Sequence, residues 1–121
     1  MPRYATLIGV SYSDLDCWGI AREFYKLEFG LELKRYYEKA PNDSSIANKL
    51  IYSSMGDFEK VTIPEFGDIV LINLDGIEAH IGIYINDQQL LHTSSKTGCM
   101  LDRMSKWKRL VVGYYRVKKN D

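Results

Sequence analysis

Apolar residues near the start of the chain recur at the spacing of one helix face. Positions i, i+4 and i+7 of this pattern are held by Ile20, Phe24 and Leu27. Asp14-Leu15-Asp16 precedes the pattern, and Gly30 follows it as a natural C-terminal stop. The pattern predicts a helix over about 16–29, with Cys17 in its first turn.

A second run of helical spacing lies further along the chain. Its apolar positions are Ile46, Ala47, Leu50, Ile51 and Met55. Pro41-Asn42-Asp43-Ser44 supplies an entry and a cap, and Gly56 supplies an exit. We expect a helix over about 44–55 whose apolar face belongs to the core.

From Pro64 onward the pattern changes to short runs rich in Ile, Val and Leu, which are typical of strands. The expected strands cover 68–74, 77–85, 90–93 and 110–117, with a further short piece over 100–103. Turn signals separate the first three of them. Because the helices come first and the strands second, the sequence predicts an α+β fold, with N-terminal helices packed on a C-terminal antiparallel β-sheet. No linker divides residues 1–121, so we expect a single domain.

Composition changes this picture little. The chain has 121 residues, 45% hydrophobic and 26% charged, and 16 basic residues balance 16 acidic ones. A neutral chain of this kind gives no indication of nucleic-acid binding, and no apolar run is long enough for membrane insertion. The N-terminus lacks the pattern of a signal peptide, so we expect synthesis in the cytoplasm. With only two cysteines, a disulfide framework is not expected.

Cys17 is the candidate for chemistry. A thiolate is favoured at a helix N-terminus, and a nucleophile also needs a base and a group that orients the base. The chain has two histidines, His80 and His92, and one of them could be the base and the other its orienter. The structural alternative is that Cys17 and both histidines are satisfied core or surface residues, as we expect for Cys99.

A zinc site is the other alternative. Cys17, His80, His92 and Cys99 would supply a Cys₂His₂ set, but the closely spaced ligand pairs that usually organise such sites are missing. We therefore expect no metal and no cofactor. Asp14, Asp16 and Asp75 are most simply read as caps and turn residues.

Several short segments, taken in order, resemble the NlpC-type cell-wall peptidases. They are Asp16-Cys17-Trp18-Gly19, Pro64-Glu65-Phe66-Gly67-Asp68-Ile69-Val70, His80-Ile81-Gly82-Ile83-Tyr84-Ile85 and Leu91-His92-Thr93-Ser94. Gly9 and Tyr12, just before the cysteine, match a family position at which a Tyr contacts the site. The resemblance covers about residues 9–117.

The resemblance implies a papain-like fold and a cysteine endopeptidase. Cys17 would be the nucleophile, His80 the base and His92 the group that orients it, with Tyr12 and Asp16 supporting the site. The implied substrate is a peptidoglycan stem peptide, cut between D-glutamate and a diamino acid.

The form of the cysteine motif adds a biological setting. Trp18 stands where the commoner motif has Ser, and the segment resembles members found in phage tails. This implies a virion-associated protein, with other phage tail proteins as partners, acting at the cell wall. A non-catalytic structural protein of a tail tip, and another thiol chemistry such as acyl transfer or deamidation, are the rival interpretations.

The hairpin between the histidines allows a geometric prediction. His80 and His92 are 92 − 80 = 12 positions apart, with Asn86-Asp87 between them. A regular two-residue turn at 86 and 87 would put the two side chains on opposite faces. We therefore expect a three- or five-residue connection or a compensating bulge, with His80 directly opposite His92 on the face that the Cys17 helix covers.

Overall fold

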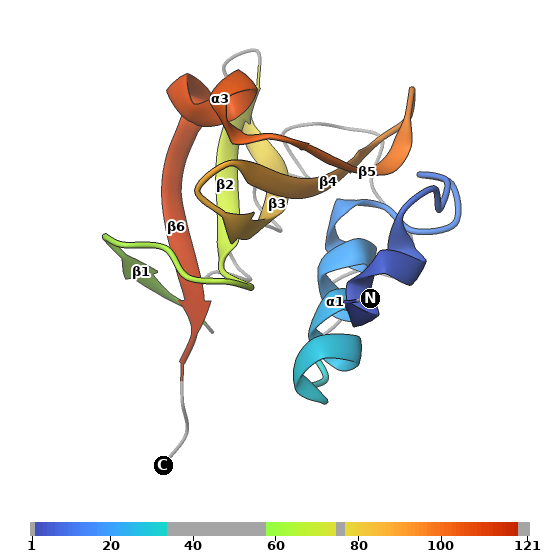
Figure 1. Ribbon diagram of the computed structural model, residues 1–121. Helices are drawn as coiled ribbons and strands as arrows, with labels where there is room; N and C mark the ends of the chain where they lie inside the picture. The colour runs from blue at the N-terminus through green and yellow to red at the C-terminus, as the bar shows by residue number, and fades with distance from the viewer. Residues whose placement is uncertain (1, 34–57, 75–76, 119–121) are drawn as a thin grey trace.

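The computed structural model describes residues 2–33, 58–74 and 77–118 (Figure 1). In chain order the elements are η1 (Arg3–Leu7, a 3-10 helix), α1 (Cys17–Phe29), β1 (Phe58–Val61), β2 (Ile69–Leu74), β3 (Ile77–Asn86), β4 (Gln89–Ser94), β5 (Gly98–Arg103), α3 (Met104–Trp107), η3 (Lys108–Leu110, a 3-10 helix) and β6 (Val111–Val117). No helix within these ranges is long and apolar enough to cross a membrane.

Helix α1 confirms the first helix prediction. The carboxylate of Asp16 accepts a hydrogen bond from the amide of Gly19 at 2.8 Å and caps the first turn. At the other end Gly30 adopts φ +63°, the left-handed conformation that ends a helix and that favours glycine. The second predicted helix, over 44–55, lies outside the described residues.

The strands form one six-stranded antiparallel sheet in the order β1-β6-β2-β3-β4-β5. All four strand predictions are confirmed, and the short piece expected over 100–103 is the edge strand β5. Strand β1 was not predicted, because within Phe58–Val61 only the two end residues are apolar. The sheet is strongly twisted, so that β4 and β5 run across the direction of β2 and β6 (Figure 1).

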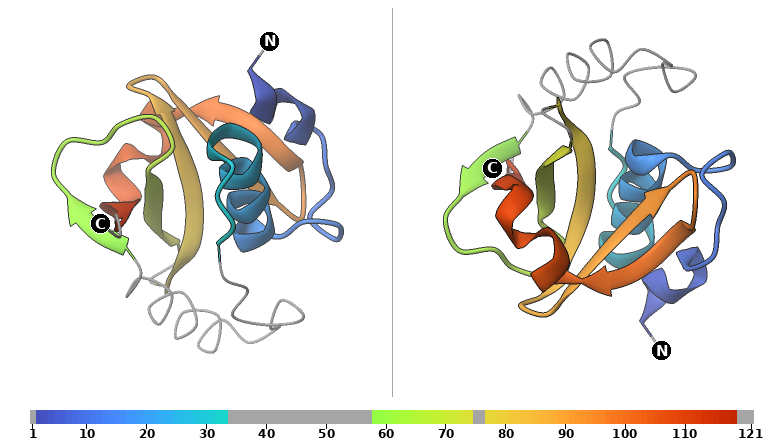
Figure 2. Two further views of the ribbon diagram at one scale, coloured as in Figure 1. Left: turned by 90° about the horizontal axis from the view of Figure 1, so that it is seen from below. Right: turned by 90° about the horizontal axis from the view of Figure 1, so that it is seen from above.

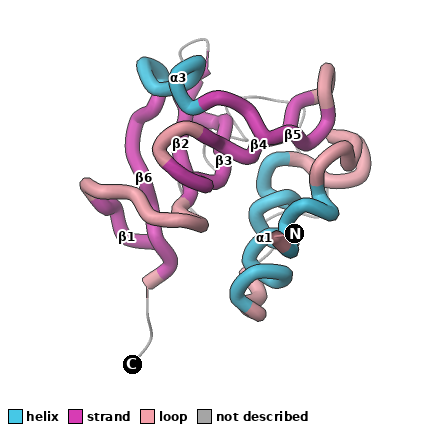
Figure 3. The backbone as a smooth tube through the Cα atoms, viewed as in Figure 1, coloured by secondary structure: helices cyan, strands magenta, loops and turns pink. Residues whose placement is uncertain are grey.

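Each face of the sheet buries its own apolar cluster. On one face α1 packs through Ile20, Ala21 and Phe24 against a row that includes Ile81 and Ile83. The other face holds a smaller cluster around Val70, Ile72, Tyr84, Leu90 and Met104, and the short helix α3 contributes to it. Helix α1 lies beside β3 and β4 on one side, and α3 lies at the end of β5, away from α1 (Figures 2 and 3). The α+β prediction is confirmed.

The segment before Cys17 is fixed to the edge of the sheet. The amide of Gly9 donates to the carbonyl of Cys99 at 2.8 Å, and the amide of Cys99 donates to the carbonyl of Val10 at the same distance. Gly98 has φ +70°, and a Cβ there would lie 2.7 Å from the carbonyl oxygen of Val10. Glycine therefore permits the close approach that holds this segment on β5.

A buried carboxylate joins β2 to β6. Asp68 is 2% exposed, and Arg116 donates to it from Nε at 2.9 Å and from Nη2 at 2.8 Å. The amide of Glu65 donates to the same carboxylate at 2.7 Å. Both carboxylate oxygens of Asp68 are thus hydrogen-bonded and face a guanidinium, which compensates for the burial of this side chain.

Candidate active site

Cys17 is the first residue of α1 and is partly buried. Its side chain packs against the cluster between α1 and the sheet. Glycine at position 19 leaves room for this cap, because a Cβ there would make tight contacts at 3.2 Å from the Asp16 carboxylate and 3.3 Å from the Leu15 side chain. The motif Asp16-Cys17-Trp18-Gly19 therefore has a local structural role, because its cap lets a helix begin directly at the cysteine.

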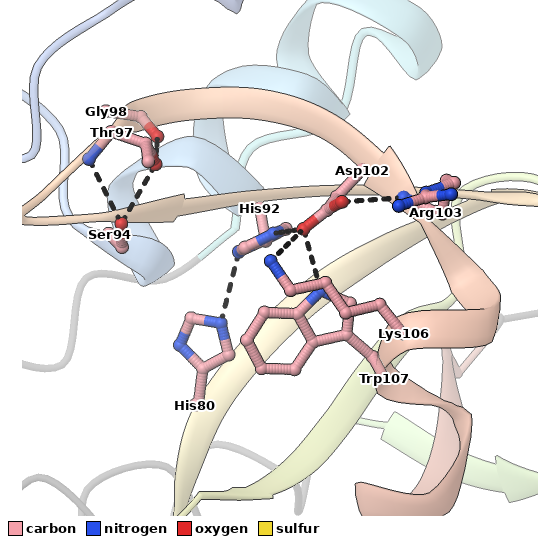
Figure 4. Close-up of polar contacts among 9 residues, drawn as sticks. All are labelled: His80, His92, Ser94, Thr97, Gly98, Asp102, Arg103, Lys106 and Trp107. Atoms are coloured by element: carbon pink, nitrogen blue, oxygen red, sulfur yellow. Dashed lines mark hydrogen bonds and ion pairs between the residues drawn. The ribbon is translucent and has the colours of Figure 1, made fainter.

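The two histidines meet on the opposite face of the sheet from α1. Nε2 of His80, on β3, lies 3.4 Å from Nδ1 of His92, on β4, and the rings are nearly perpendicular at 84° (Figure 4). His92 is 4% exposed. The predicted pairing of His80 with His92 is thus present as a side-chain contact.

The hairpin achieves this contact through a bulge. Asn86 pairs with Gln89 around a two-residue turn, but Tyr84 pairs with Leu90, so the register shifts between Tyr84 and Asn86. The compensating bulge that we predicted returns both histidines to one face.

The predicted direct opposition of the two histidines is wrong. The last recorded pair toward the histidines is Ile83 with Leu91, and one further step in this register sets Gly82 opposite His92. His80 is therefore a diagonal neighbour of His92, two residues further along β3. Long side chains can still meet across such a diagonal. This explains why the two imidazoles are in contact although the predicted register is wrong.

The predicted placement of α1 over the histidine face is also wrong. Helix α1 packs on the face of Ile81, Ile83 and Ile85, whereas His80 shares its face with Tyr84. The reason is that the isoleucine row is the larger apolar surface, and the apolar stripe of α1 gains more by burying it. Cys17 reaches the site from the end of its helix, where the amide of Ile81 contacts the sulfur.

Burial is the main cause of the pKa shifts of Cys17 and His80. It raises the pKa of the Cys17 thiol to about 12; the Asp16 carboxylate raises it further, and nearby backbone amides only partly offset this. Burial, and then the neighbouring His92, lower the pKa of His80 to about 4. At neutral pH the favoured forms are thus a neutral thiol and a neutral imidazole, not the resting thiolate that the helix start alone suggests.

Tyr12 and Asp16 were predicted to support the site. The pKa of Tyr12 is raised by burial and then by the charges of Cys17 and Asp16, so the phenol lies close to both residues. The side chain of Tyr12 is 37% exposed, so it stands partly in solvent. Asp16 acts through the helix cap, and its charge opposes ionisation of Cys17.

Two residues that the sequence did not indicate complete the surroundings of His92. Nε2 of His92 lies 3.0 Å from Oδ2 of Asp102, and Nε1 of Trp107 donates to the same oxygen at 2.9 Å (Figure 4). Asp102 comes from β5 and Trp107 from α3. The only sequence signal for Asp102 was that this carboxylate lies within a predicted strand. The alignment of Asp102 with His92 depends on strand pairing, which the sequence does not reveal.

The described residues do not assemble the zinc set. No group of three or more His, Cys, Asp or Glu side chains within the described ranges is arranged to hold a metal ion. Cys99 is 2% exposed and packs in the cluster beneath α1, on the other face of the sheet from the histidine pair.

Comparison with known proteins identifies the family. The model of the NlpC/P60 family matches residues 4–116. The chain belongs to the NlpC/P60 family. The chain is 29% identical over 119 residues to a protein of Escherichia coli named murein DD-endopeptidase MepS/murein LD-carboxypeptidase. The match covers 90% of this chain and 56% of that protein, so the chain spans just over half the length of this curated relative.

Solved structures of the family share the fold. The P60 domain of an antigen from M. avium subspecies paratuberculosis superimposes with a TM-score of 0.65 at 15% identity, covering 97% of this chain and 91% of that one. The NlpC/p60 domain of the peptidoglycan hydrolase SagA gives a TM-score of 0.60 at 17% identity, covering 97% and 93%. At these identities the likeness concerns the fold, and it confirms the predicted papain-like architecture.

Proposed function

We propose that this NlpC/P60 chain is a cysteine peptidase that hydrolyses an amide bond of peptidoglycan stem peptides. The observation that carries the proposal is the meeting of a capped helix start at Cys17 with the strand that bears His80, whose ring contacts His92. The names of the E. coli relative and of SagA support the choice of peptidoglycan as substrate.

In the proposed mechanism the proton moves as the bond forms. The free ring nitrogen of His80 accepts the Cys17 proton while the sulfur attacks the amide carbonyl, and the carbonyl electron pair moves to the oxygen. The backbone amide of Cys17 donates to this oxyanion. His80 then protonates the leaving amine as the C–N bond breaks. Water, deprotonated by His80, cleaves the resulting thioester and restores the thiol.

The proposal extends to the bond that is cut. By the family resemblance, we place cleavage between D-glutamate and the diamino acid. The names of the E. coli relative instead refer to DD-endopeptidase and LD-carboxypeptidase activities. These three bonds give fragments of different mass, so product analysis separates them.

Digestion of purified peptidoglycan tests the proposal. Wild type should release stem-peptide fragments identifiable by mass spectrometry, and Cys17→Ala should release none, because the nucleophile is removed. Cys99→Ala is the matched control, since this thiol lies outside the site, and it should give the wild-type products. No release by folded wild-type protein would contradict the proposal and favour the rival structural role.

We also propose that the protein acts as a component of a phage tail. The support is the sequence Asp16-Cys17-Trp18-Gly19, in which Trp18 replaces the commoner Ser. In this setting the tail would deliver the domain to the cell wall.

A further inference from the structure

The His80–His92 contact continues to a third group. His92 is 4% exposed and Asp102 is 9% exposed, and they meet at 3.0 Å between Nε2 and Oδ2. Strand pairing explains the meeting, because His92 pairs with Met100 and Leu90 pairs with Asp102. Asp102 is therefore two residues from the partner of His92, on the same face of the sheet. The line of contacts runs from His80 through His92 to Asp102 (Figure 4).

Asp102 is surrounded by donors. The amide of Arg103 donates to Oδ1 at 2.8 Å, the indole of Trp107 donates to Oδ2 at 2.9 Å, and Nζ of Lys106 lies 3.5 Å from Oδ2. Burial raises the pKa of Asp102, but the hydrogen bonds from Trp107, His92 and Arg103 and the charge of Lys106 outweigh it and hold that pKa well below its usual range. Asp102 is therefore an ionised carboxylate, which can only accept.

An acceptor at this place decides where the histidine protons lie. Because Asp102 cannot donate, Nε2 of His92 must carry the proton, and in the neutral ring Nδ1 is then an acceptor. This acceptor faces Nε2 of His80 at 3.4 Å, so Nε2 of His80 carries the proton of that ring. Nδ1 of His80 is left with the free electron pair, which is the form that a base for Cys17 needs.

Trp107 packs against both imidazoles and also binds Asp102. Its ring centroid lies 4.9 Å from that of His92 and 5.6 Å from that of His80. The indole thus limits the rotation of both imidazoles while its N–H group binds the carboxylate.

We propose that Asp102 is a positioning residue that sets the tautomers of His92 and His80 and so leaves Nδ1 of His80 free to accept the thiol proton. The inference rests on the proposed peptidase function and adds a fourth member to the Cys17, His80 and His92 set.

A tautomer switch can be designed from these contacts. In Asp102→Asn an NH₂ group replaces one carboxylate oxygen. This group must face either the Arg103 amide or the Trp107 indole, and both of these are donors, so neither orientation satisfies every donor. Trp107→Phe removes the indole donor and keeps an aromatic ring. In the double variant the NH₂ group therefore faces His92, and the proton of His92 must move to Nδ1. That proton then points at Nε2 of His80 and moves the His80 proton to Nδ1, which removes the base.

Nitrogen-15 spectra of the imidazole rings read the tautomers without substrate. The chain has two histidines, so the spectrum holds two rings, and His92→Gln assigns them. At pH 7 we expect Nε2–H on both rings in wild type and in Trp107→Phe, and Nδ1–H on both in Asp102→Asn with Trp107→Phe. The double variant should lose at least ~100-fold in kcat relative to Trp107→Phe, with little change in KM, because a general base is lost.

The outcomes are distinguishable. Nδ1–H on either ring of the wild type overturns the inference without any variant, even if the double variant fails to fold. Unchanged tautomers in a folded double variant, or a kcat equal to that of Trp107→Phe, overturn it as well. If wild type shows Nε2–H on both rings and the switch occurs but peptidoglycan is not cut, the positioning by Asp102 stands and the proposed function fails.

Discussion

At the scale of single residues, burial sets the chemistry of the site. The helix start provides amides that stabilise a thiolate, but burial of Cys17 and the charge of Asp16 outweigh them. The same burial keeps His80 neutral. In the proposed reaction, a neutral pair would couple deprotonation of the thiol to attack on the carbonyl, and the cysteine would be less reactive when no substrate is present.

The lowered pKa of His80 has a consequence for stability. In the unfolded chain His80 binds a proton below about pH 6.5, whereas in the folded protein it does so only below about 4. Between these values the unfolded state binds more protons, so folding stability is lost as pH falls through this window. The loss is at most about 3 kcal/mol, and less where solvent screens the partly buried ring.

Thermal melts of wild type and His80→Gln from pH 7 to pH 4 measure this effect. The melting temperature of wild type should fall more steeply over the window, because the variant has no ring to protonate at this position. Parallel curves for the two proteins would show that His80 titrates at its ordinary pKa in the fold.

At the scale of elements, local sequence patterns were sufficient to predict the helix and the strands, but they did not predict how neighbouring strands align. Helix α1 could be predicted because its spacing, its cap at Asp16 and its stop at Gly30 are all local signals. The strands from β2 to β6 could be predicted from short apolar runs. The bulge before Asn86 and the alignment of Asp102 with His92 depend on pairing between strands, so the sequence identified the two histidines but not their register or their third partner.

The join between β2 and β6 gives a prediction at this scale. Arg116→Met leaves the buried charge of Asp68 without its partner, so we expect a loss of about 3 kcal/mol in the free energy of unfolding. Glu65→Gln is the control, because this side chain also pairs with Arg116 but is 69% exposed, and its effect should stay within about 0.5 kcal/mol. Denaturant unfolding of the three proteins measures both, and equal losses would mean that burial of Asp68 is not what makes the pair important.

At the scale of the whole molecule, the described residues form one α+β unit, with Cys17 at the start of α1 and the His80–His92 contact on the face of the sheet that α1 does not cover. The chain spans 56% of its E. coli relative, so the remaining length of that relative has no counterpart in the match. We propose that a phage tail brings this domain to its substrate.

Peptide mass spectrometry of purified particles tests that proposal. Particles induced from cells that carry the gene should contain peptides of this chain at a fixed ratio to the tail proteins. The same cells carrying a frameshift in the gene are the control. Detection of the chain only in the soluble lysate, in cultures that release intact particles, would contradict the tail assignment.

The position of β6 determines when the folded sheet can form. This last strand, Val111–Val117, does not lie at an edge but between β1 and β2. A chain emerging from the ribosome therefore cannot complete its sheet until residue 117 is free, and pairing with β1 joins positions more than fifty residues apart, such as Val61 and Tyr114. Such distant pairing makes folding slow compared with helical proteins of this size. A chain that has not yet released residue 117 from the ribosome, or that is truncated before it, thus lacks the finished sheet behind the histidines, and the proposed hydrolytic activity should be absent from it.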